Sequence, residues 1–268
     1  MSRDYLAEVS DGGSKLPYRN VVIGVDGVGK TSLGASAPSP IFLLARGETG
    51  LETLIESGQL GKTKHLPVAE SWEDVLGATR ALLDGAHKYK TIVVDTANGV
   101  ERLTHEHVCR RDFGNVWSGE DGFLAYNRGA DVALTDWREF LGLLDQLRAA
   151  KQMQIVLLVH SRVRNFRNPE GADFDRYTAD LNEKTWSLTS RWCDLVLFAN
   201  SQVTTTTAGK GRREGVGGQE RVLFTERTAA WDAKNRLGLP PKISMGSSGA
   251  EAWANLTKAI ASARREGS

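Results

Sequence analysis

The stretch Gly24-Val25-Asp26-Gly27-Val28-Gly29-Lys30-Thr31 directly follows the apolar run Val21-Val22-Ile23. It matches the Walker A or P-loop pattern G-x-x-x-x-G-K-[ST], in which glycines allow a tight loop whose N–H groups point inward and hold phosphate. Lys30 is expected at the β- and γ-phosphates of ATP, and Thr31 as a ligand of Mg²⁺. The predicted cradle comprises Gly24, Val25, Asp26, Gly27, Val28, Gly29, Lys30, Thr31 and Ser32.

Composition limits the classes of protein to which the chain can belong. Its 268 residues are 40% hydrophobic and 25% charged, as in a single globular domain. We expect this domain at residues 19–263, between a flexible arm at 1–18 and a frayed end at 264–268. The net charge of +1 excludes a wholesale nucleic-acid coat, and two cysteines are too few for a disulfide framework or a zinc site. With neither a signal peptide nor a membrane-spanning run, we expect a cytoplasmic protein without a membrane partner.

Strand-like and helix-like segments alternate along the chain, which predicts an α/β fold with a mainly parallel central sheet flanked by helices and a late antiparallel hairpin. The predicted strands are Asn20–Gly24, Ile41–Ala45, Thr91–Asp95, Gln154–His160, Leu195–Ala199 and Arg221–Thr225. Ser71 begins a helix with a capping-box pattern, and Ser248 caps a final helix with Glu251 three residues later. A helical stripe predicts core packing for Trp137, Phe140, Leu141, Leu144 and Leu147.

Two acidic residues follow predicted strands. Asp95 ends the buried strand 91–95 and is expected to hold Mg²⁺; a surface aspartate is the alternative. The spacing between Thr31 and Asp95 leaves room for one more strand, and we interpret 41–45 as this inserted strand. Glu48 lies just past its carboxyl end, where a carboxylate can orient and deprotonate an attacking water. The alternatives are a solvated Glu48 or a role for the nearby Glu52.

Three further residues are candidates for catalysis. His160 ends the strand 154–160, where a polar side chain can contact the γ-phosphate, or serve as a structural histidine. Lys234 and Arg236 lie two residues apart on an extended segment, so both point the same way. Such a pair can stabilise the charge on a transferring phosphoryl group, although a charged edge strand is the alternative.

Together these pieces resemble the RecA-like ATPase core, and more closely the phage-encoded family of RecA-like, AAA-type ATP-binding proteins linked to recombination and single-strand annealing. The resemblance covers about residues 20–245. The matching segments are Gly24–Thr31, Glu48–Leu51, Thr91–Asp95, Val159–Ser161, Asn168–Gly171, Phe174–Tyr177, Cys193–Leu197 and Ala233–Arg236. The resemblance implies that Lys234 and Arg236 act on a neighbouring subunit's ATP, within a ring or filament. His160 departs from the glutamine usual at the sensor position.

The resemblance also implies that DNA lies along the loops 112–131 and 161–185. The second loop mixes guanidinium groups and rings, as single-strand binding requires, but nearby carboxylates nearly cancel its charge. The glycine-rich region 208–221 suits a hairpin tip on a phosphate backbone, and a solvated turn is the alternative. The candidate DNA-binding residues are Arg162, Arg164, Phe166, Arg167, Arg176, Tyr177, Lys210, Arg212 and Arg213.

These observations predict a Mg²⁺-dependent, oligomeric ATPase that binds single-stranded DNA in phage-type homologous recombination, single-strand annealing or replication. Its further partners are then phage or host recombination and replication proteins, in the host cytoplasm. Two alternatives remain at this point. One is a small-molecule or nucleotide kinase that uses the same loop, and the other is an ATP-dependent switch such as a helicase loader.

Overall fold

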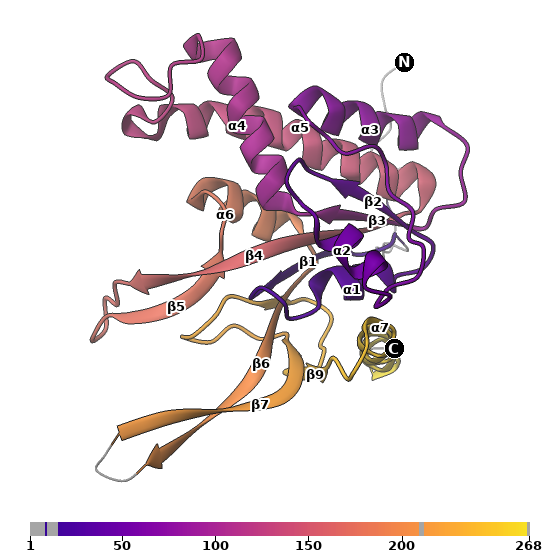
Figure 1. Cartoon of the computed structure of the whole chain (residues 1–268), viewed down its shortest axis with the longest axis vertical. Helices are drawn as coiled ribbons and strands as arrows, with labels where there is room; N and C mark the ends of the chain where they lie inside the picture. The colour runs from indigo at the N-terminus through magenta and orange to yellow at the C-terminus, as the bar shows by residue number, and fades with distance from the viewer. Residues whose placement is uncertain (1–8, 10–15, 209–211, 267–268) are drawn as a thin grey trace.

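The computed structural model describes residue 9, residues 16–208 and residues 212–266 (Figure 1). Strands and helices alternate through most of the chain. Their bounds are β1 (Arg19–Gly24), α1 (Lys30–Ala35), β2 (Pro40–Leu44), α2 (Gly50–Glu56), α3 (Trp72–Asp84), β3 (Thr91–Asp95), α4 (Ala97–Phe113), η1 (Ala125–Asn127), α5 (Arg128–Lys151), β4 (Gln154–Phe166), β5 (Phe174–Ala179), α6 (Glu183–Trp192), β6 (Leu195–Ala208), β7 (Arg212–Phe224), β8 (Lys234–Asn235), β9 (Lys242–Ser244) and α7 (Gly249–Glu266).

The strands form one sheet with the order β2-β3-β4-β1-β6-β7-β9. The first five strands in this order pair in parallel. β7 pairs antiparallel with β6 and with β9, while β5 pairs antiparallel with β4, and β8 with β6. The predicted α/β fold, with a mainly parallel sheet flanked by helices and a late antiparallel hairpin, is therefore confirmed. It is consistent with a P-loop NTPase fold.

The spacing predicts β2 as an extra strand between the phosphate strand β1 and the magnesium strand β3, and for the order in the sheet this prediction is wrong. β2 lies between β1 and β3 in the sequence, but in the sheet β4 occupies that place and β2 lies at the edge beyond β3. Leu44 pairs with Asp95, so β2 and β3 end at the same level. The segment after β2, which contains Glu48, therefore still lies beside the carboxyl end of β3.

Both faces of the parallel part of the sheet are buried. Successive apolar side chains of each strand point alternately into two clusters, one on each face. Val21 and Ile23 face the cluster that includes α3, α4 and α5, whereas Val22 faces the cluster that includes α1, α2 and α7. Figure 1 shows these helix groups on opposite sides of the sheet. The predicted stripe on α5 belongs to the first cluster, which confirms its core role for Trp137, Phe140, Leu141, Leu144 and Leu147.

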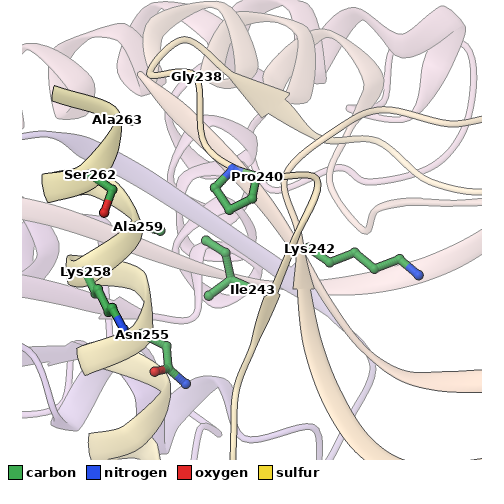
Figure 2. Close-up of a pocket in the computed structure, with 9 residues that line it drawn as sticks. All are labelled: Gly238, Pro240, Lys242, Ile243, Asn255, Lys258, Ala259, Ser262 and Ala263. Carbon is green, nitrogen blue, oxygen red and sulfur yellow. The ribbon is translucent and has the colours of Figure 1, made fainter. Parts of the chain in front are cut away.

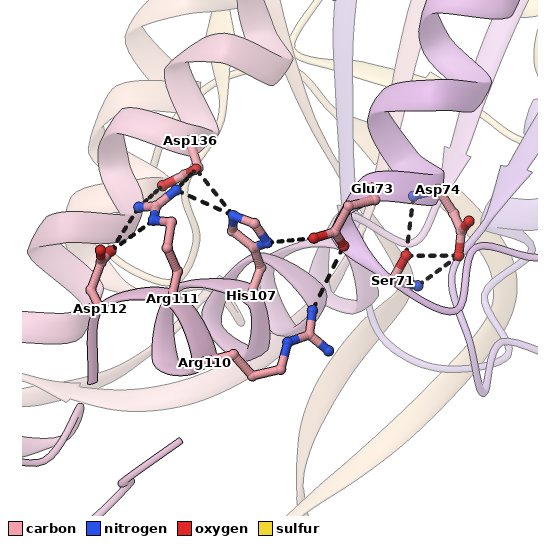
Figure 3. Close-up of polar contacts among 8 residues, drawn as sticks. All are labelled: Ser71, Glu73, Asp74, His107, Arg110, Arg111, Asp112 and Asp136. Atoms are coloured by element: carbon pink, nitrogen blue, oxygen red, sulfur yellow. Dashed lines mark hydrogen bonds and ion pairs between the residues drawn. The ribbon is translucent and has the colours of Figure 1, made fainter. Parts of the chain in front are cut away.

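Polar contacts fix the helix starts and the arrangement of three helices. Ser71 forms a capping box with Asp74, and the Ser248 hydroxyl accepts from the Glu251 N–H at 3.1 Å, as predicted. Between α3, α4 and α5, a network of side chains spans the helix contacts (Figure 3). His107 contacts Glu73 at 2.8 Å, and Arg111 contacts the buried Asp136 at 2.7 Å. These contacts hold α4 and its neighbours in one orientation.

Two strands extend beyond their predicted ends. β4 continues past His160 to Phe166, and β6 continues past Ala199 to Ala208, each pairing with the next strand as a projecting hairpin (Figure 1). The outer part of β4 is polar and mostly exposed, so it lacks the apolar pattern that marks the buried part. Segment 161–179 is thus largely a hairpin rather than a loop.

The chain ends also differ in part from the expectation. Residues 1–8 and 10–15 of the predicted arm lie outside the described residues, but the Tyr18 carbonyl accepts from the Ile155 N–H at 3.1 Å. At the other end, α7 runs to Glu266, so residues 264–266 are helical, while 267–268 lie outside the described residues. Among the helices that the structure describes, none has the length and apolar character needed to cross a membrane.

Candidate functional site

The predicted phosphate cradle forms a loop between β1 and α1. Gly29 has φ 99°, a left-handed conformation that favours glycine. The buried Lys30 ammonium lies across the loop and donates to the carbonyls of Gly24 at 2.8 Å and Val25 at 3.0 Å. Burial lowers the pKa of Lys30, against the opposing effect of nearby carboxylates that include Asp26. The lysine is therefore held at the loop by groups that a phosphate can replace.

The residues predicted to hold Mg²⁺ are in contact. The Thr31 hydroxyl donates to Asp95 Oδ2 at 2.9 Å. Asp95 is 5% exposed, and its burial raises the pKa of the carboxyl to about 6. A hydroxyl and a buried carboxylate are the oxygen ligands that Mg²⁺ prefers. A cation at this place would favour the ionised form of Asp95, so the donor set fits the predicted ion.

Glu48 points toward the same place from the segment after β2. Its Oε1 accepts from the Thr96 hydroxyl at 2.6 Å, and Thr96 in turn caps α4 by accepting from the Gly99 N–H at 3.3 Å. A Cβ on Gly99 would lie 2.5 Å from Ala45 Cβ, so the start of α4 packs very closely on this segment. Burial acts to raise the pKa of Glu48, but His160 and the Thr96 hydroxyl hold it below its usual value.

His160 connects the loop to this glutamate. Its Nδ1 lies 2.7 Å from Asp26 Oδ1, and its Nε2 lies 3.9 Å from Glu48 Oε2. The Glu48 carboxylate raises the pKa of His160, whereas burial acts to lower it. The net result is a pKa of His160 above its usual value. His160 therefore links Asp26 of the loop to Glu48.

These side chains line a single pocket of about 450 Å³ at the carboxyl ends of the parallel strands. We call it the P-loop pocket. The structure thus brings together five predicted residues from separate parts of the chain, namely Lys30, Thr31, Glu48, Asp95 and His160. Glu52, the alternative to Glu48, is exposed on α2 and does not line the pocket.

Among the residues of the P-loop pocket that sequence reasoning missed, one is charged. Arg221 on β7 lines it, and its guanidinium lies beside Gly29. Arg221 is the first residue of the predicted strand 221–225 and the last residue of the glycine-rich region 208–221, and neither pattern places it at the P-loop. Its proximity to the loop depends on strand register, which no local pattern encodes.

Lys234 and Arg236 lie elsewhere. β8 pairs with β6 at Leu195 and Val196, near the amino end of β6, whereas the pocket lies at the carboxyl ends. Lys234 Nζ donates to the carbonyls of Ser190, Arg191 and Cys193 at 2.6, 3.2 and 2.7 Å, at the end of α6. Lys234 therefore caps a helix within its own chain.

Arg236 is exposed, and among the described residues it has no hydrogen-bond or ion-pair partner. It lines a hollow of about 490 Å³ beside α6, which we call the α6 groove. Its walls include Glu183, Trp186, Arg191, Arg227, Asp232, Lys234 and Arg236. The α6 groove therefore presents an arginine that no group of the described chain neutralises.

The predicted DNA-binding residues differ in their surroundings. Arg176 is 5% exposed and pairs with Asp232 at 2.7 Å, and Tyr177 packs on Phe198 in the core, so both are used for packing. Arg162 pairs with Asp180 at 3.1 Å. Arg164, Phe166 and Arg167 are exposed on the β4–β5 hairpin. Lys210 lies outside the described residues, and Arg212 and Arg213 begin β7.

A further hollow of about 430 Å³ separates α7 from the segment 238–243 (Figure 2). Its lining is Gly238, Pro240, Lys242, Ile243, Asn255, Lys258, Ala259, Ser262 and Ala263. None of these nine is a predicted site residue. We therefore assign this hollow no part in the chemistry of the P-loop pocket.

The family comparison agrees with the geometry. The model of a family described as an AAA domain matches residues 16–237, which include β1, the P-loop, Glu48, Asp95, His160 and the segment up to Arg236. No curated protein sequence matches the chain. The family match covers well over half of the 268 residues. The chain therefore belongs to the AAA domain family of P-loop ATPases.

Proposed function

We propose that the chain is a Mg²⁺-dependent ATPase that transfers the γ-phosphoryl group of ATP to water. One observation carries this proposal: Lys30, the Thr31–Asp95 pair and Glu48 converge on one pocket from three different strand ends. A phosphate grip, a set of oxygen ligands and a base in one pocket are the parts that this reaction requires.

Each residue has a chemical role in this proposal. The loop N–H groups and Lys30 bind the phosphates, after Lys30 exchanges the carbonyls of Gly24 and Val25 for phosphate oxygens. Thr31 and Asp95 would hold Mg²⁺, which would supply positive charge to neutralise the phosphates. Glu48 accepts the proton of the attacking water as the water oxygen bonds to the γ-phosphorus and ADP leaves. Thr96 fixes the Glu48 carboxylate through the 2.6 Å hydrogen bond.

We further propose that the active unit is an oligomer, in which Arg236 reaches the ATP of the next copy. The α6 groove lies toward the opposite end of the strands from the P-loop pocket. A head-to-tail arrangement of copies would therefore bring a groove against a pocket, and this heterologous contact closes into a ring or continues as a filament. Arg236 is the better candidate for this contact, because Lys234 is already bound to the end of α6.

Single-stranded DNA is the proposed ligand of the β4–β5 hairpin. Arg164 and Arg167 are exposed beside Phe166, a combination that suits phosphate contact and base stacking. β4 runs from Gln154 through His160 to this hairpin, so one strand joins the P-loop pocket to the proposed DNA contacts. We place the activity in phage-type recombination, single-strand annealing or replication, in the host cytoplasm, with phage or host proteins of these processes as partners.

The experiment that tests this function measures phosphate release from ATP, with and without Mg²⁺ and a single-stranded oligonucleotide. We expect Mg²⁺-dependent turnover that DNA stimulates, and its loss in Lys30→Ala. The double variant R164Q/R167Q should keep the basal rate and lose about tenfold in DNA affinity at low salt. Mg²⁺-dependent turnover that DNA does not change would remove the DNA part and leave the ATPase.

A further inference from the structure

Arg221 lies where the sheet passes into the β6–β7 hairpin. Gly24, at the end of β1, pairs with Ala199 of β6, and Arg221 of β7 pairs with Ser201, two residues further along β6. The pairing register then shifts between Ser201 and Val203. The side chain of Arg221 therefore leaves the sheet just beyond the level at which the P-loop begins.

The Arg221 guanidinium is anchored on two sides. Its Nη2 donates to the Gly246 carbonyl at 3.0 Å. Its Nη1 lies 2.8 Å from the point that a Cβ on Gly29 would occupy, so the guanidinium uses the space that this glycine leaves free. One wall of the P-loop pocket thus consists of a positioned arginine whose remaining N–H groups are available to a ligand.

The charge of Arg221 is not neutralised within the described part of the chain, where it forms no ion pair. Glu251 is close enough to interact with Arg221 at longer range, but its carboxylate already accepts from the N–H and hydroxyl of Ser247. The pocket also contains Lys30 and the carboxylates of Asp26, Glu48 and Asp95. A ligand with several negative charges therefore gains from a second cation at this wall.

Arg221 approaches the P-loop from the side opposite to Glu48. In the sheet, β1 lies between β4 and β6, with β2 and β3 on one flank and β7 on the other. Glu48 follows β2, Asp95 ends β3, and Arg221 lies on β7. Phosphate oxygens near Arg221 therefore differ from those near the proposed site of water attack.

We propose that Arg221 binds the nucleotide polyphosphate from within the same chain, at phosphates that ADP and ATP share. This inference rests on the proposed nucleotide binding at the P-loop. Arg221 is then a third recognition element of the P-loop pocket, beside the loop N–H groups and Lys30, and it belongs to the strand that forms the β6–β7 hairpin.

The test uses the full chain and measures Kd by calorimetry for ADP and for a slowly hydrolysed ATP analogue. The variants are Arg221→Gln, Arg221→Lys and the matched control Lys258→Gln, which removes one exposed charge from the hollow of Figure 2. Arg221→Gln should raise both Kd values by about 10- to 100-fold, as expected for a lost hydrogen bond to a charged group. Arg221→Lys should give a smaller rise, and Lys258→Gln should match the wild type.

The outcomes separate this inference from the function on which it rests. Wild-type Kd values in Arg221→Gln would overturn the role of Arg221 while leaving nucleotide binding intact. A rise for the ATP analogue alone would overturn the assignment to shared phosphates. Absence of binding in the wild type would overturn the proposed function as well. If Arg221→Gln melts at a lower temperature than the wild type without nucleotide, its Kd values do not separate binding from folding. In that case the Kd values of Arg221→Lys decide, provided that this variant melts at the wild-type temperature. Unchanged Kd values in Arg221→Lys would mean that Arg221 has only a structural role.

Discussion

The P-loop pocket and the α6 groove each gather ionisable side chains, but the two hollows hold these side chains differently. In the pocket, Thr31–Asp95 and Thr96–Glu48 are bonded at 2.9 and 2.6 Å. In the groove, Arg236 has no hydrogen-bond or ion-pair partner among the described residues. The pocket is preorganised by its own chain, whereas the groove leaves an arginine to be neutralised by something else. This difference supports the proposal that the pocket binds and cleaves ATP, while the groove contacts another copy of the chain.

The largest effect should come from removing the carboxylate of Glu48, the proposed base. Glu48→Gln should lower ATP turnover by about 100- to 10,000-fold while nucleotide binding persists, because the amide cannot accept the proton of water. Phosphate release and ADP affinity measure the two parts. Glu52→Gln, on the exposed side of α2, is the matched control and should be unaffected. Equal turnover in the two variants would remove Glu48 from the mechanism.

The groove should also be needed for turnover, but across an interface. Arg236→Ala should lower turnover by about 100-fold, as for other arginines that stabilise a phosphoryl transition state, without changing stability. Arg191→Ala, in the same groove, is the control. Mixing Arg236→Ala with Lys30→Ala should restore part of the activity, since an intact pocket then meets an intact arginine. A mixture as inactive as its components would rule out action between copies.

A pH titration tests the contact between α4, which begins beside the P-loop pocket, and α6, which borders the α6 groove. Glu101 on α4 accepts from the N–H of Asn182, the residue just before α6, at 3.0 Å, and burial raises the pKa of Glu101 from 4.5 to about 7. The folded state therefore favours the protonated acid, so its contribution to stability is full below pH 4.5 and lost as pH rises toward 7. Relative to Glu101→Gln, the wild type should lose about 3 kcal/mol over this window in urea unfolding. A constant difference between the two proteins would contradict the shifted pKa.

His105 should give the opposite slope and makes the comparison with Glu101→Gln necessary. Its burial lowers the pKa to about 4, from 6.5. The unfolded chain then binds a proton that the folded chain excludes, so stability falls as pH decreases from 6.5 to 4. The wild-type profile alone is therefore flatter than either contribution.

The smallest expected effect is on the free energy of unfolding, and it distinguishes the role of Lys234 from that of Arg236. Lys234→Gln should lower the free energy of unfolding by about 2 kcal/mol, because the carbonyls at the end of α6 lose a charged donor. Arg236→Ala should leave this free energy unchanged. Urea denaturation of both variants makes the measurement. If Lys234→Gln is as stable as the wild type, the helix-capping contacts contribute little, and Lys234 becomes a candidate for the same intermolecular contact as Arg236.

The main residues of the P-loop pocket could be predicted from the sequence, because its motifs lie at the carboxyl ends of strands, and these ends meet in any parallel sheet. Lys30, Glu48 and Asp95 could be placed from their positions after apolar runs. Arg221 could not, since its approach to Gly29 depends on the register of an antiparallel strand almost two hundred residues along the chain, roughly the span of a whole domain.

The hairpins show a second limit of sequence reasoning. The outer parts of β4 and β6 carry few apolar residues, so they resemble loops until their pairing partners are known. Arg176 was predicted to bind DNA from the charges near it in the sequence, but its ion-pair partner Asp232 comes 56 residues later. Local patterns thus predicted buried elements well, and they failed where pairing between distant segments determines the structure.

The close packing at Gly99 has a consequence for variants of this chain. An alanine there would place a methyl group 2.5 Å from Ala45 Cβ, so either the start of α4 or the segment that carries Glu48 would have to shift. A single carbon atom outside every recognised motif would thus disturb the segment that positions the proposed base, Glu48. Relatives that carry a side chain at this position are therefore candidates for proteins that retain nucleotide and have given up cleaving it.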